Sequence, residues 1–332
     1  MTSSITQVVL YHRACSDGLA AAWAASKVLH PMETLYLPYQ YGEKLPREIE
    51  GRHLIMVDLS LTPAQIEQIY RKTVKSILII DHHKTAIDKL HGLVTPIFSY
   101  DTYKDQRHRE SAPVFMLADL AHSGAVLTWA FFHNRYKDNF DSDVPKALQL
   151  VQDYDLWHFE FAESDAVNAW VLNRARDIDA LDEAIGSDGG FFGHVEGEGQ
   201  TLVEYDLSIV KSVAKTYPRK GVWNGFTFAL VNGPHHLRNR ICDHLNIMHD
   251  FTACYTERNG KTVFSLRANK DIGCDTTLIS EKFGGGGHAD ASAFAVDTGL
   301  PRRLFAENPF GKPTLIQRIK LVWWALTTRS LI

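Results

Sequence analysis

The stretch that decides the fold is SILIIDHH, residues 76–83. Four of its first five residues are aliphatic, a composition typical of a parallel strand that is buried on both faces. The run then ends abruptly in an acid and two imidazoles. Because the ligand sites of open α/β sheets lie beyond the carboxyl ends of such strands, we expect Asp81, His82 and His83 to line a crevice.

Three further apolar runs end in side chains that can bind a metal ion. These are residues 8–11, followed by His12, Cys15 and Asp17; residues 54–57, followed by Asp58; and residues 147–151, followed by Asp153 and Asp155. Each run is predicted to be a strand that ends at the same edge of the sheet. Neutral histidine and ionised aspartate bind hard or borderline divalent ions, and two ions that share carboxylates need about this many ligands. One strand ending in aspartate is ordinary, whereas four together predict a metal site.

The rest of the N-terminal half alternates between helical and strand patterns. Residues 18–29 are alanine-rich and predict a helix that ends before Pro31, residues 35–39 predict a strand, and residues 63–70 predict a helix opened by a proline. This alternation indicates an α/β fold with a doubly wound parallel sheet. Residues 101–110 are polar without an apolar period and predict a solvated loop.

The C-terminal part predicts a second, smaller α+β unit. Residues 226–231 predict a strand, residues 238–248 a helix, and the Asn-Gly turn at residues 259–260 a hairpin. A helix near residues 276–283 and a closing strand at residues 291–296 complete it.

A glycine-rich turn and one arginine are the candidate anion-binding groups of this unit. Residues 284–287 are all glycine, so their backbone amides can approach an anion closely, and His288 adds a donor; the same glycines also suit a tight turn. Arg267, near a strand end, is either a bidentate phosphate partner or part of a surface salt bridge.

Composition narrows the class of protein. The chain has 332 residues, of which 45% are hydrophobic and 22% charged, enough for two domains that each have a core. No apolar run approaches the roughly 18 residues that a bilayer span needs, and residues 1–7 lack the basic start of a secretion signal. The four cysteines show no C-x-x-C spacing. We therefore expect a cytoplasmic protein without membrane attachment, structural zinc or disulfides.

Net charge restricts the nucleic-acid partners. At −4 it argues against a protein that coats long nucleic acids by neutralising their phosphates. A short oligonucleotide or a small phosphate ester remains compatible, because a metal pair and a few arginines can hold it locally. Residues 314–326 form an amphipathic helical pattern that predicts packing on this subunit or on a second copy, which would make a homodimer.

Taken together, the motifs resemble those of the DHH phosphoesterases, which include the RecJ exonucleases, the nanoRNA phosphatases and the family II inorganic pyrophosphatases. The resemblance covers about residues 8–296. It rests on HRACSDG at residues 12–18, Asp58, DHH at residues 81–83, Asp153, SLR at residues 265–267 and GGGGH at residues 284–288. It implies a DHH metal-binding catalytic domain at residues 1–170, a helical linker at 171–222, a DHH-associated substrate-binding domain at 223–300 and a helical tail at 301–332.

The resemblance also implies roles for individual residues. One ion would be held by His12, the Cys15 position and Asp58; the second by Asp17, Asp58, His82 and Asp153. The catalytic group would be Asp58, Asp81, His82 and His83, in which His83 contacts the phosphate and Asp81 orients an imidazole. Substrate would be held by His83, Arg267, Gly285, Gly286, Gly287 and His288.

The first and fourth motifs leave alternatives open. Relatives usually carry Asp-x-Asp in the first motif, and here Cys15 stands where the first carboxylate belongs. A thiolate there would shift the site from the expected Mn²⁺ or Mg²⁺ toward Zn²⁺ or iron, or Cys15 does not bind and the ion is held weakly. The fourth motif fits either Asp153 or Asp155, and Asp153 is preferred.

The resulting functional expectation is a metal-dependent phosphodiesterase of the exonuclease type. It would hydrolyse short single-stranded oligonucleotides or dinucleotides to mononucleotides with two divalent ions, Mn²⁺ foremost. One alternative is a phosphatase that acts on polyphosphate or a 3′-phosphonucleotide. Another is a non-catalytic nucleotide-binding module that has lost a ligand at Cys15.

Overall fold

A computed structural model defines the fold. It describes residues 5–13, 15–70, 73–108, 114–136, 140, 143–186, 190–216, 218–223, 225–269 and 271–298. The chain divides into two compact units, Met1–Val203 and Glu204–Ile332, and the division lies within helix α9 (Gly190–Lys215). The predicted amphipathic tail lies outside the described residues.

The first unit contains a six-stranded sheet in the order β2-β1-β3-β4-β6-β5, in which every neighbouring pair is parallel. The prediction of a doubly wound parallel sheet is confirmed. The strands are β1 (Gln7–His12), β2 (Thr34–Tyr39), β3 (His53–Val57), β4 (Ser76–Asp81), β5 (Thr95–Pro96) and β6 (Val114–Ala118).

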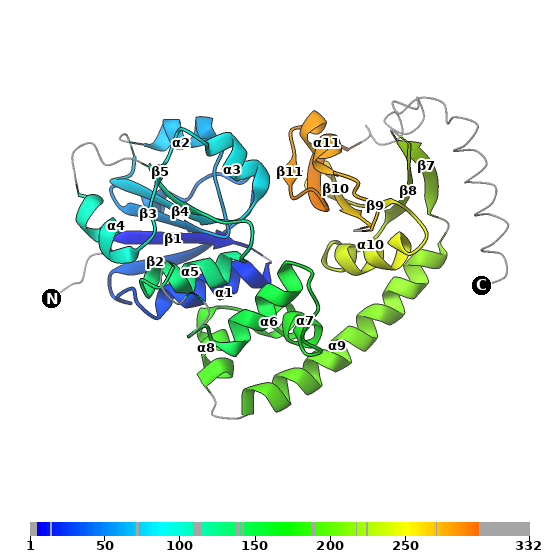
Figure 1. The fold of residues 1–332 in the computed structure, drawn as a ribbon, viewed down its shortest axis with the longest axis horizontal. Coiled ribbons are helices and arrows are strands. Elements are labelled where there is room, and N and C mark those ends of the chain that lie inside the picture. Colours follow the sequence, from blue (N-terminus) through cyan, green and yellow to red (C-terminus); the bar gives the residue numbers. More distant parts are fainter. Residues whose placement is uncertain are drawn as a thin grey trace. The chain divides into compact units, whose positions relative to one another are not determined.

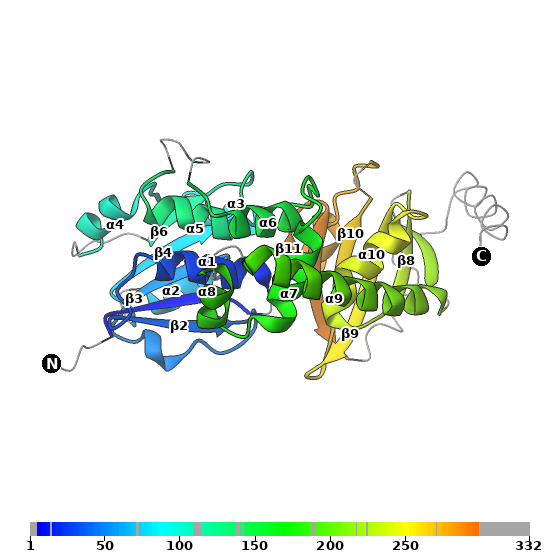
Figure 2. The ribbon, with the colours of Figure 1, turned by 90° about the horizontal axis from the view of Figure 1, so that it is seen from below.

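Helices cover both faces of this sheet (Figures 1 and 2). The helices of this unit are α1 (Ser16–Ser26), α2 (Pro63–Ile69), α3 (Lys84–Leu90), α4 (Tyr100–Gln106), α5 (Gly124–Phe132), α6 (Lys146–Asp155), α7 (Ser164–Arg174) and α8 (Ile178–Gly186), with a 3₁₀ turn at Arg47–Ile49; α7 and α8 pack on other helices. Alternate residues of β1 show the consequence, since Val9 enters a core with α1 and α5, whereas Val8 enters another with α2 and α3. Burial on both faces explains why the strands read as continuous apolar runs.

Local sequence explains where several helices begin. Thr62 and Gln65 form a reciprocal capping box at the start of α2, with Pro63 in the first turn. The alanines of α1 are fully buried, which lets this helix pack closely on α5 and on the sheet. Ser123 caps α5 by accepting a hydrogen bond from the amide of Val126.

Two predicted elements were wrong. Residues 147–151 lie in helix α6 rather than in a strand, because their apolar side chains, with Tyr154, recur at helical spacing and form its buried side. Residues 101–110 were predicted as a loop, yet helix α4 covers residues 100–106. The Ser99 side chain caps α4, and its one fully buried residue, Tyr103, anchors it.

The second unit contains a mixed sheet in the order β11-β12-β10-β9-β8-β7, in which only β8 and β9 pair in parallel. This agrees with the predicted α+β unit. Its elements are β7 (Arg219–Trp223), β8 (Phe226–Asn232), α10 (Arg238–Asn246), β9 (Phe251–Arg258), β10 (Lys261–Ala268), α11 (Thr277–Ser280), β11 (Gly286–Gly287) and β12 (Ala291–Asp297), with 3₁₀ turns at His235–Leu237 and Glu281–Phe283.

None of the described helices is both long enough and apolar enough to cross a bilayer.

Candidate metal centre

The centre is built where strands β1, β3 and β4 end at one edge of the parallel sheet. β1 leads through α1 to β2 on one side, whereas β3 leads through α2 to β4 on the other. The winding direction therefore reverses between β1 and β3, and such a switch point opens a crevice beyond the strand ends. His12 ends β1, Asp58 follows β3, and His82 follows β4, so the fold delivers all three to this crevice.

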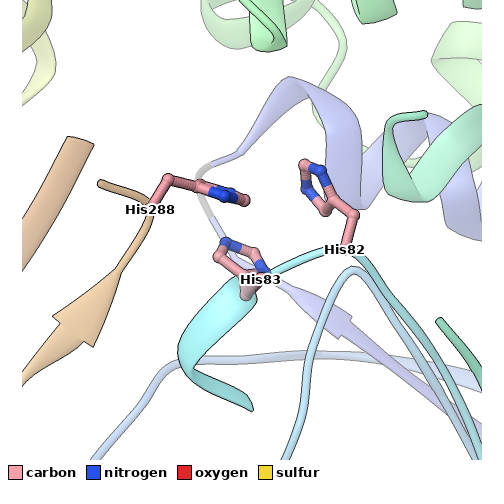
Figure 3. Close-up of side chains that lie close together, drawn as sticks. All are labelled: His82, His83 and His288. Atoms are coloured by element: carbon pink, nitrogen blue, oxygen red, sulfur yellow. The ribbon is translucent and has the colours of Figure 1, made fainter. Parts of the chain in front are cut away.

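The imidazole of His82 lies within reach of three carboxylates. Its Nε2 atom is 3.3 Å from Asp58 Oδ1, 3.5 Å from Asp155 Oδ2 and 3.6 Å from Asp17 Oδ2. His82, Asp58 and Asp17 are all buried. Figure 3 shows the His82 and His83 rings, which come from consecutive residues between β4 and α3.

The ionisation of these groups reflects crowded negative charge. Burial raises the pKa of Asp17, and the neighbouring Asp58 and Asp155 raise it further. Burial alone would lower the pKa of His82, but the surrounding carboxylates raise it to about 10. Several carboxylates that share a single imidazole in a buried site are the surroundings in which a divalent cation is stabilised. Asp17, Asp58 and His82 each offer a ligand atom within 4.8 Å of the others.

A second group of possible ligands shares Asp58. His12, Cys15 and Asp58 also place one ligand atom each within 4.8 Å of one another. His12 Nδ1 lies 3.6 Å from Asp58 Oδ2, and both atoms are buried with no hydrogen-bond partner among the described residues. An unsatisfied buried nitrogen and carboxylate oxygen are costly unless a further group, such as a cation, binds them. The residues present therefore fit a metal ion in each group.

Each oxygen of Asp58 faces a different group. Oδ1 is the oxygen near His82, and Oδ2 is the one near His12. Burial opposes ionisation of Asp58, but His12 and His82 outweigh it and lower its pKa. This carboxylate is therefore placed to bridge two ions.

Close packing against Gly124 fixes two of the acids. Asp58 has a backbone φ of 51°, in the left-handed region that non-glycine residues rarely adopt. A Cβ atom added to Gly124 would lie 2.6 Å from Asp58 Cβ and 2.9 Å from Asp17 Oδ2. The amides of Gly124 and Ala125 donate to Asp17 at 2.7 and 3.0 Å. Sequence reasoning missed this role, although the Ser-Gly pair at the start of α5 was its signal.

The carboxylate of Asp81 forms hydrogen bonds with the neighbouring backbone and with the ring of His83. Its Oδ1 atom lies 2.7 Å from His83 Nδ1 and accepts a hydrogen bond from the amide of His82 at 2.8 Å. Its Oδ2 atom accepts a hydrogen bond from the Ser60 hydroxyl. Burial raises the pKa of this carboxyl, but the charge of His83 outweighs that effect and lowers it. Asp81 is thus placed to fix the orientation of the His83 ring.

The structure separates the two candidate acids of the fourth motif. Asp153 accepts hydrogen bonds from the amides of Glu160 and Phe161, at 2.9 and 3.1 Å, and from the Ser164 hydroxyl. Asp155 instead points to His82. Residues two apart share one face of a strand, whereas successive residues of a helix turn by about 100°. Residues 153 and 155 therefore project to roughly opposite sides of α6.

In the second unit, the guanidinium of Arg267 donates two hydrogen bonds to other groups of the protein. Its Nη2 atom donates to Asn239 Oδ1 at 2.7 Å, and its Nη1 atom donates to the carbonyl oxygen of Leu266 at 2.9 Å. Asn239 belongs to α10, which packs on β9 and β10. These two hydrogen bonds orient the guanidinium.

Much of the glycine-rich turn is used to build the sheet. The amides of Gly284, Gly285 and His288 donate to Glu281, Ser280 and Ala291 carbonyl oxygens, respectively. A Cβ atom at Gly285 would clash with the carbonyl oxygen of Ala293. These three amides are therefore satisfied within the unit. His288 follows β11, and Figure 3 shows its ring.

Comparison with known proteins gives the fold a name. No family model matches the chain. RecJ of Thermus thermophilus, solved with Mn²⁺, superposes with a TM-score of 0.53 at 16% identity, over 91% of this chain and 51% of RecJ. The protein has the fold of this RecJ, a DHH-like fold. The chain thus spans about half the length of this RecJ.

Two other similarities were found for this DHH-fold chain. An uncharacterised protein of Acanthamoeba polyphaga mimivirus is 25% identical, over 87% of this chain and 67% of that protein. The pGpG-specific phosphodiesterase PggH of Vibrio cholerae has a TM-score of 0.46 at 14% identity, over 92% of this chain and 100% of PggH.

A methyl group at Gly124 tests the packing at the centre. Gly124→Ala should weaken Mn²⁺ binding by about 10–100-fold, because the added Cβ displaces Asp58 and Asp17. Isothermal titration calorimetry of the folded variant measures this. The matched control is Gly193→Ala in α9, where an added Cβ meets no atom within 4 Å. Unchanged Mn²⁺ affinity in Gly124→Ala would contradict the packing argument.

Paired substitutions test the two acids of α6. Asp155→Asn should lower Mn²⁺ affinity by about 10–100-fold with little change in thermal stability. Asp153→Asn should do the opposite, because an NH2 group replaces one of the two accepting oxygens, and the donor that it faces is left unsatisfied at a cost of about 1–3 kcal/mol. Calorimetric metal titration and thermal unfolding of both variants distinguish them. A reversed pattern would restore Asp153 as the metal-facing acid.

Proposed function

We propose that the protein is a metal-dependent phosphodiesterase that hydrolyses short single-stranded oligonucleotides or dinucleotides to mononucleotides. The single observation that carries this proposal is the bridging position of Asp58, whose two oxygens face separate groups of buried ligands. Two metal ions that share a ligand are a recurring arrangement for attack on phosphorus. The DHH fold and the motif resemblance support the same reaction class.

We assign the ions to the two groups that share Asp58. His12, Cys15 and Asp58 would hold one, and Asp17, Asp58, His82 and Asp155 the other. When bound, such a pair lowers the pKa of a shared water and stabilises the leaving oxygen. The backbone amides at the start of α5 keep Asp17 oriented, and the left-handed backbone of Asp58 aims its carboxylate into the crevice.

His83 is proposed to contact the scissile phosphate. Because Asp81 lies at its Nδ1 atom, we assign the contact with a substrate oxygen to the opposite nitrogen, Nε2. Burial lowers the pKa of His83, but the Asp81 charge outweighs this effect and raises it, which favours the cationic donor form. Asp81 acts through this imidazole and is a positioning residue rather than a catalytic one.

The second unit is proposed to bind the substrate through side chains. Arg267, oriented by Asn239, and the imidazole of His288 supply donors for a phosphate. The amides of Gly284 and Gly285 are already bonded within the unit, so Gly285 supports this site by close packing. Gly286 and Gly287 complete the turn that leads to His288.

Manganese is the proposed ion, with Cys15 as the residue that can change this preference. A thiolate favours softer ions than a carboxylate does, which makes Zn²⁺ or Fe²⁺ the competing ions in the group that contains His12. Burial raises the pKa of the Cys15 thiol, and the nearby carboxylates raise it further, so a cation must replace its proton for it to act as a ligand.

Elemental analysis tests the role of Cys15. We expect Cys15→Asp to raise the ratio of manganese to zinc and iron in protein purified from the same medium, because a carboxylate replaces a thiolate among the ligands. Cys274→Ala, which removes a buried thiol in the other unit, is the control. Identical metal content and identity in native protein and Cys15→Asp would identify Cys15 as a bystander.

A substrate panel tests the reaction. With Mn²⁺ present, we expect release of mononucleotides from labelled dinucleotides and short single-stranded oligonucleotides, and loss of at least about 100-fold in kcat/KM in Asp58→Asn. Cyclic dinucleotides, polyphosphate and a 3′-phosphonucleotide complete the panel. Faster phosphate release from the last two would favour a phosphatase. Nucleotide binding without turnover in Mn²⁺, Mg²⁺ or Zn²⁺ would favour a non-catalytic module.

A further inference from the structure

An aromatic loop, defined as residues 156–161, follows the end of helix α6 and has an unusual backbone. Trp157 and Phe159 have φ angles of 63° and 54°. The left-handed region is rare for bulky residues, and such strain persists only where the surrounding structure enforces it. Neither residue is a glycine or an asparagine, for which this conformation would be ordinary.

One buried carboxylate enforces this conformation. Asp153 receives the amides of Glu160 and Phe161 with its side chain, while its carbonyl oxygen accepts the amide of His158 at 2.9 Å. The turn after α6 is therefore closed from both ends by a single residue. Strain in the aromatic loop is maintained by these bonds.

Two aromatic rings of the loop cluster with one from the end of α6. The ring centroids of Tyr154, Trp157 and Phe159 lie 5.0 to 5.7 Å apart in edge-to-face arrangements. Tyr154 is buried and supports the other two, whereas Phe159 is 45% exposed. The strained backbone thus presents an aromatic surface outward rather than into a core.

The aromatic loop begins next to the candidate metal centre. Asp155, the last residue of α6, has its Oδ2 atom 3.5 Å from His82 Nε2. Trp157 is two residues farther along the chain, a separation of at most about 7 Å between Cα atoms. A nucleotide whose phosphate is held at the centre is therefore long enough for its base to reach this loop.

We propose that Trp157 and Phe159 form a stacking platform for a nucleobase of the substrate. The inference rests on the proposed phosphodiesterase function and restricts its substrates to nucleotides, since polyphosphate has no group to stack. Aromatic faces accept every base, so the platform would give a preference for a base without a preference for its identity. Single-stranded substrates follow, because a paired base has its faces covered by its neighbours.

Loss of the exposed ring tests the platform. Phe159→Ala should raise KM for a dinucleotide by about 5- to 150-fold, the range that stacking on one aromatic side chain covers, with kcat little changed. A dinucleotide with one base replaced by an abasic residue should show no such rise when the abasic position is the stacked one; both positions are tested. Phe159→Tyr keeps the ring and should keep KM. Phe98→Ala, at another exposed phenylalanine of the same unit, is the matched control.

A binding experiment separates this inference from the proposed reaction. Calorimetry should show that the native protein binds a nucleoside 5′-monophosphate more tightly than ribose 5-phosphate, and that Phe159→Ala and Trp157→Leu lose this difference. Thermal unfolding checks that each variant is folded, and Phe159→Leu replaces Phe159→Ala if the latter is not. Equal affinity of the native protein for both ligands, or a base preference unchanged in folded variants, would overturn the platform. Absence of hydrolysis alone would count only against the proposed reaction.

Discussion

The first unit depends on holding buried carboxylates close together around the imidazole of His82. Burial raises the pKa of Asp17, and repulsion by the like charges of Asp58 and Asp155 raises it further. The fold reduces the cost with the amides at the start of α5, which donate to Asp17, and with the His82 ring, which shares the remaining charge. The arrangement is typical of a protein that binds cations at this position.

The parallel sheet brings these site residues together although they are far apart in the sequence. His12, Asp58 and His82 each come directly at or after the end of a central strand, so their separation is set by the spacing between strands. Each of these strands is locked by apolar cores on both faces. The left-handed backbone of Asp58 and the missing side chain of Gly124 then allow the acids to approach each other. The packed cores thus stabilise the strained backbone of Asp58 and the crowded carboxylates at the carboxyl ends of the strands.

The sequence predicted this edge well because strand ends are local features. An apolar run followed by Asp or His identifies a position along the chain, and parallel pairing brings such positions together without further information. Contacts that depend on helix phase were not accessible in the same way. Asp153 and Asp155 are two residues apart, and only the knowledge that α6 is a helix separates their directions. Helix α4 was missed because it buries a single residue, Tyr103, which is too few to give an apolar period in the sequence.

The two acids of α6 have complementary consequences. Asp155 faces His82 at the metal centre, whereas Asp153 binds the amides that shape the aromatic loop. Since both project from the same final turn of one helix, a displacement of that turn would move a metal-facing group and the loop together. Helix α6 thus links the metal centre, through Asp155, to the aromatic loop, through Asp153. The hydrogen bonds to Asp153 hold the left-handed backbone of Trp157 and Phe159 directly after the residue that faces His82.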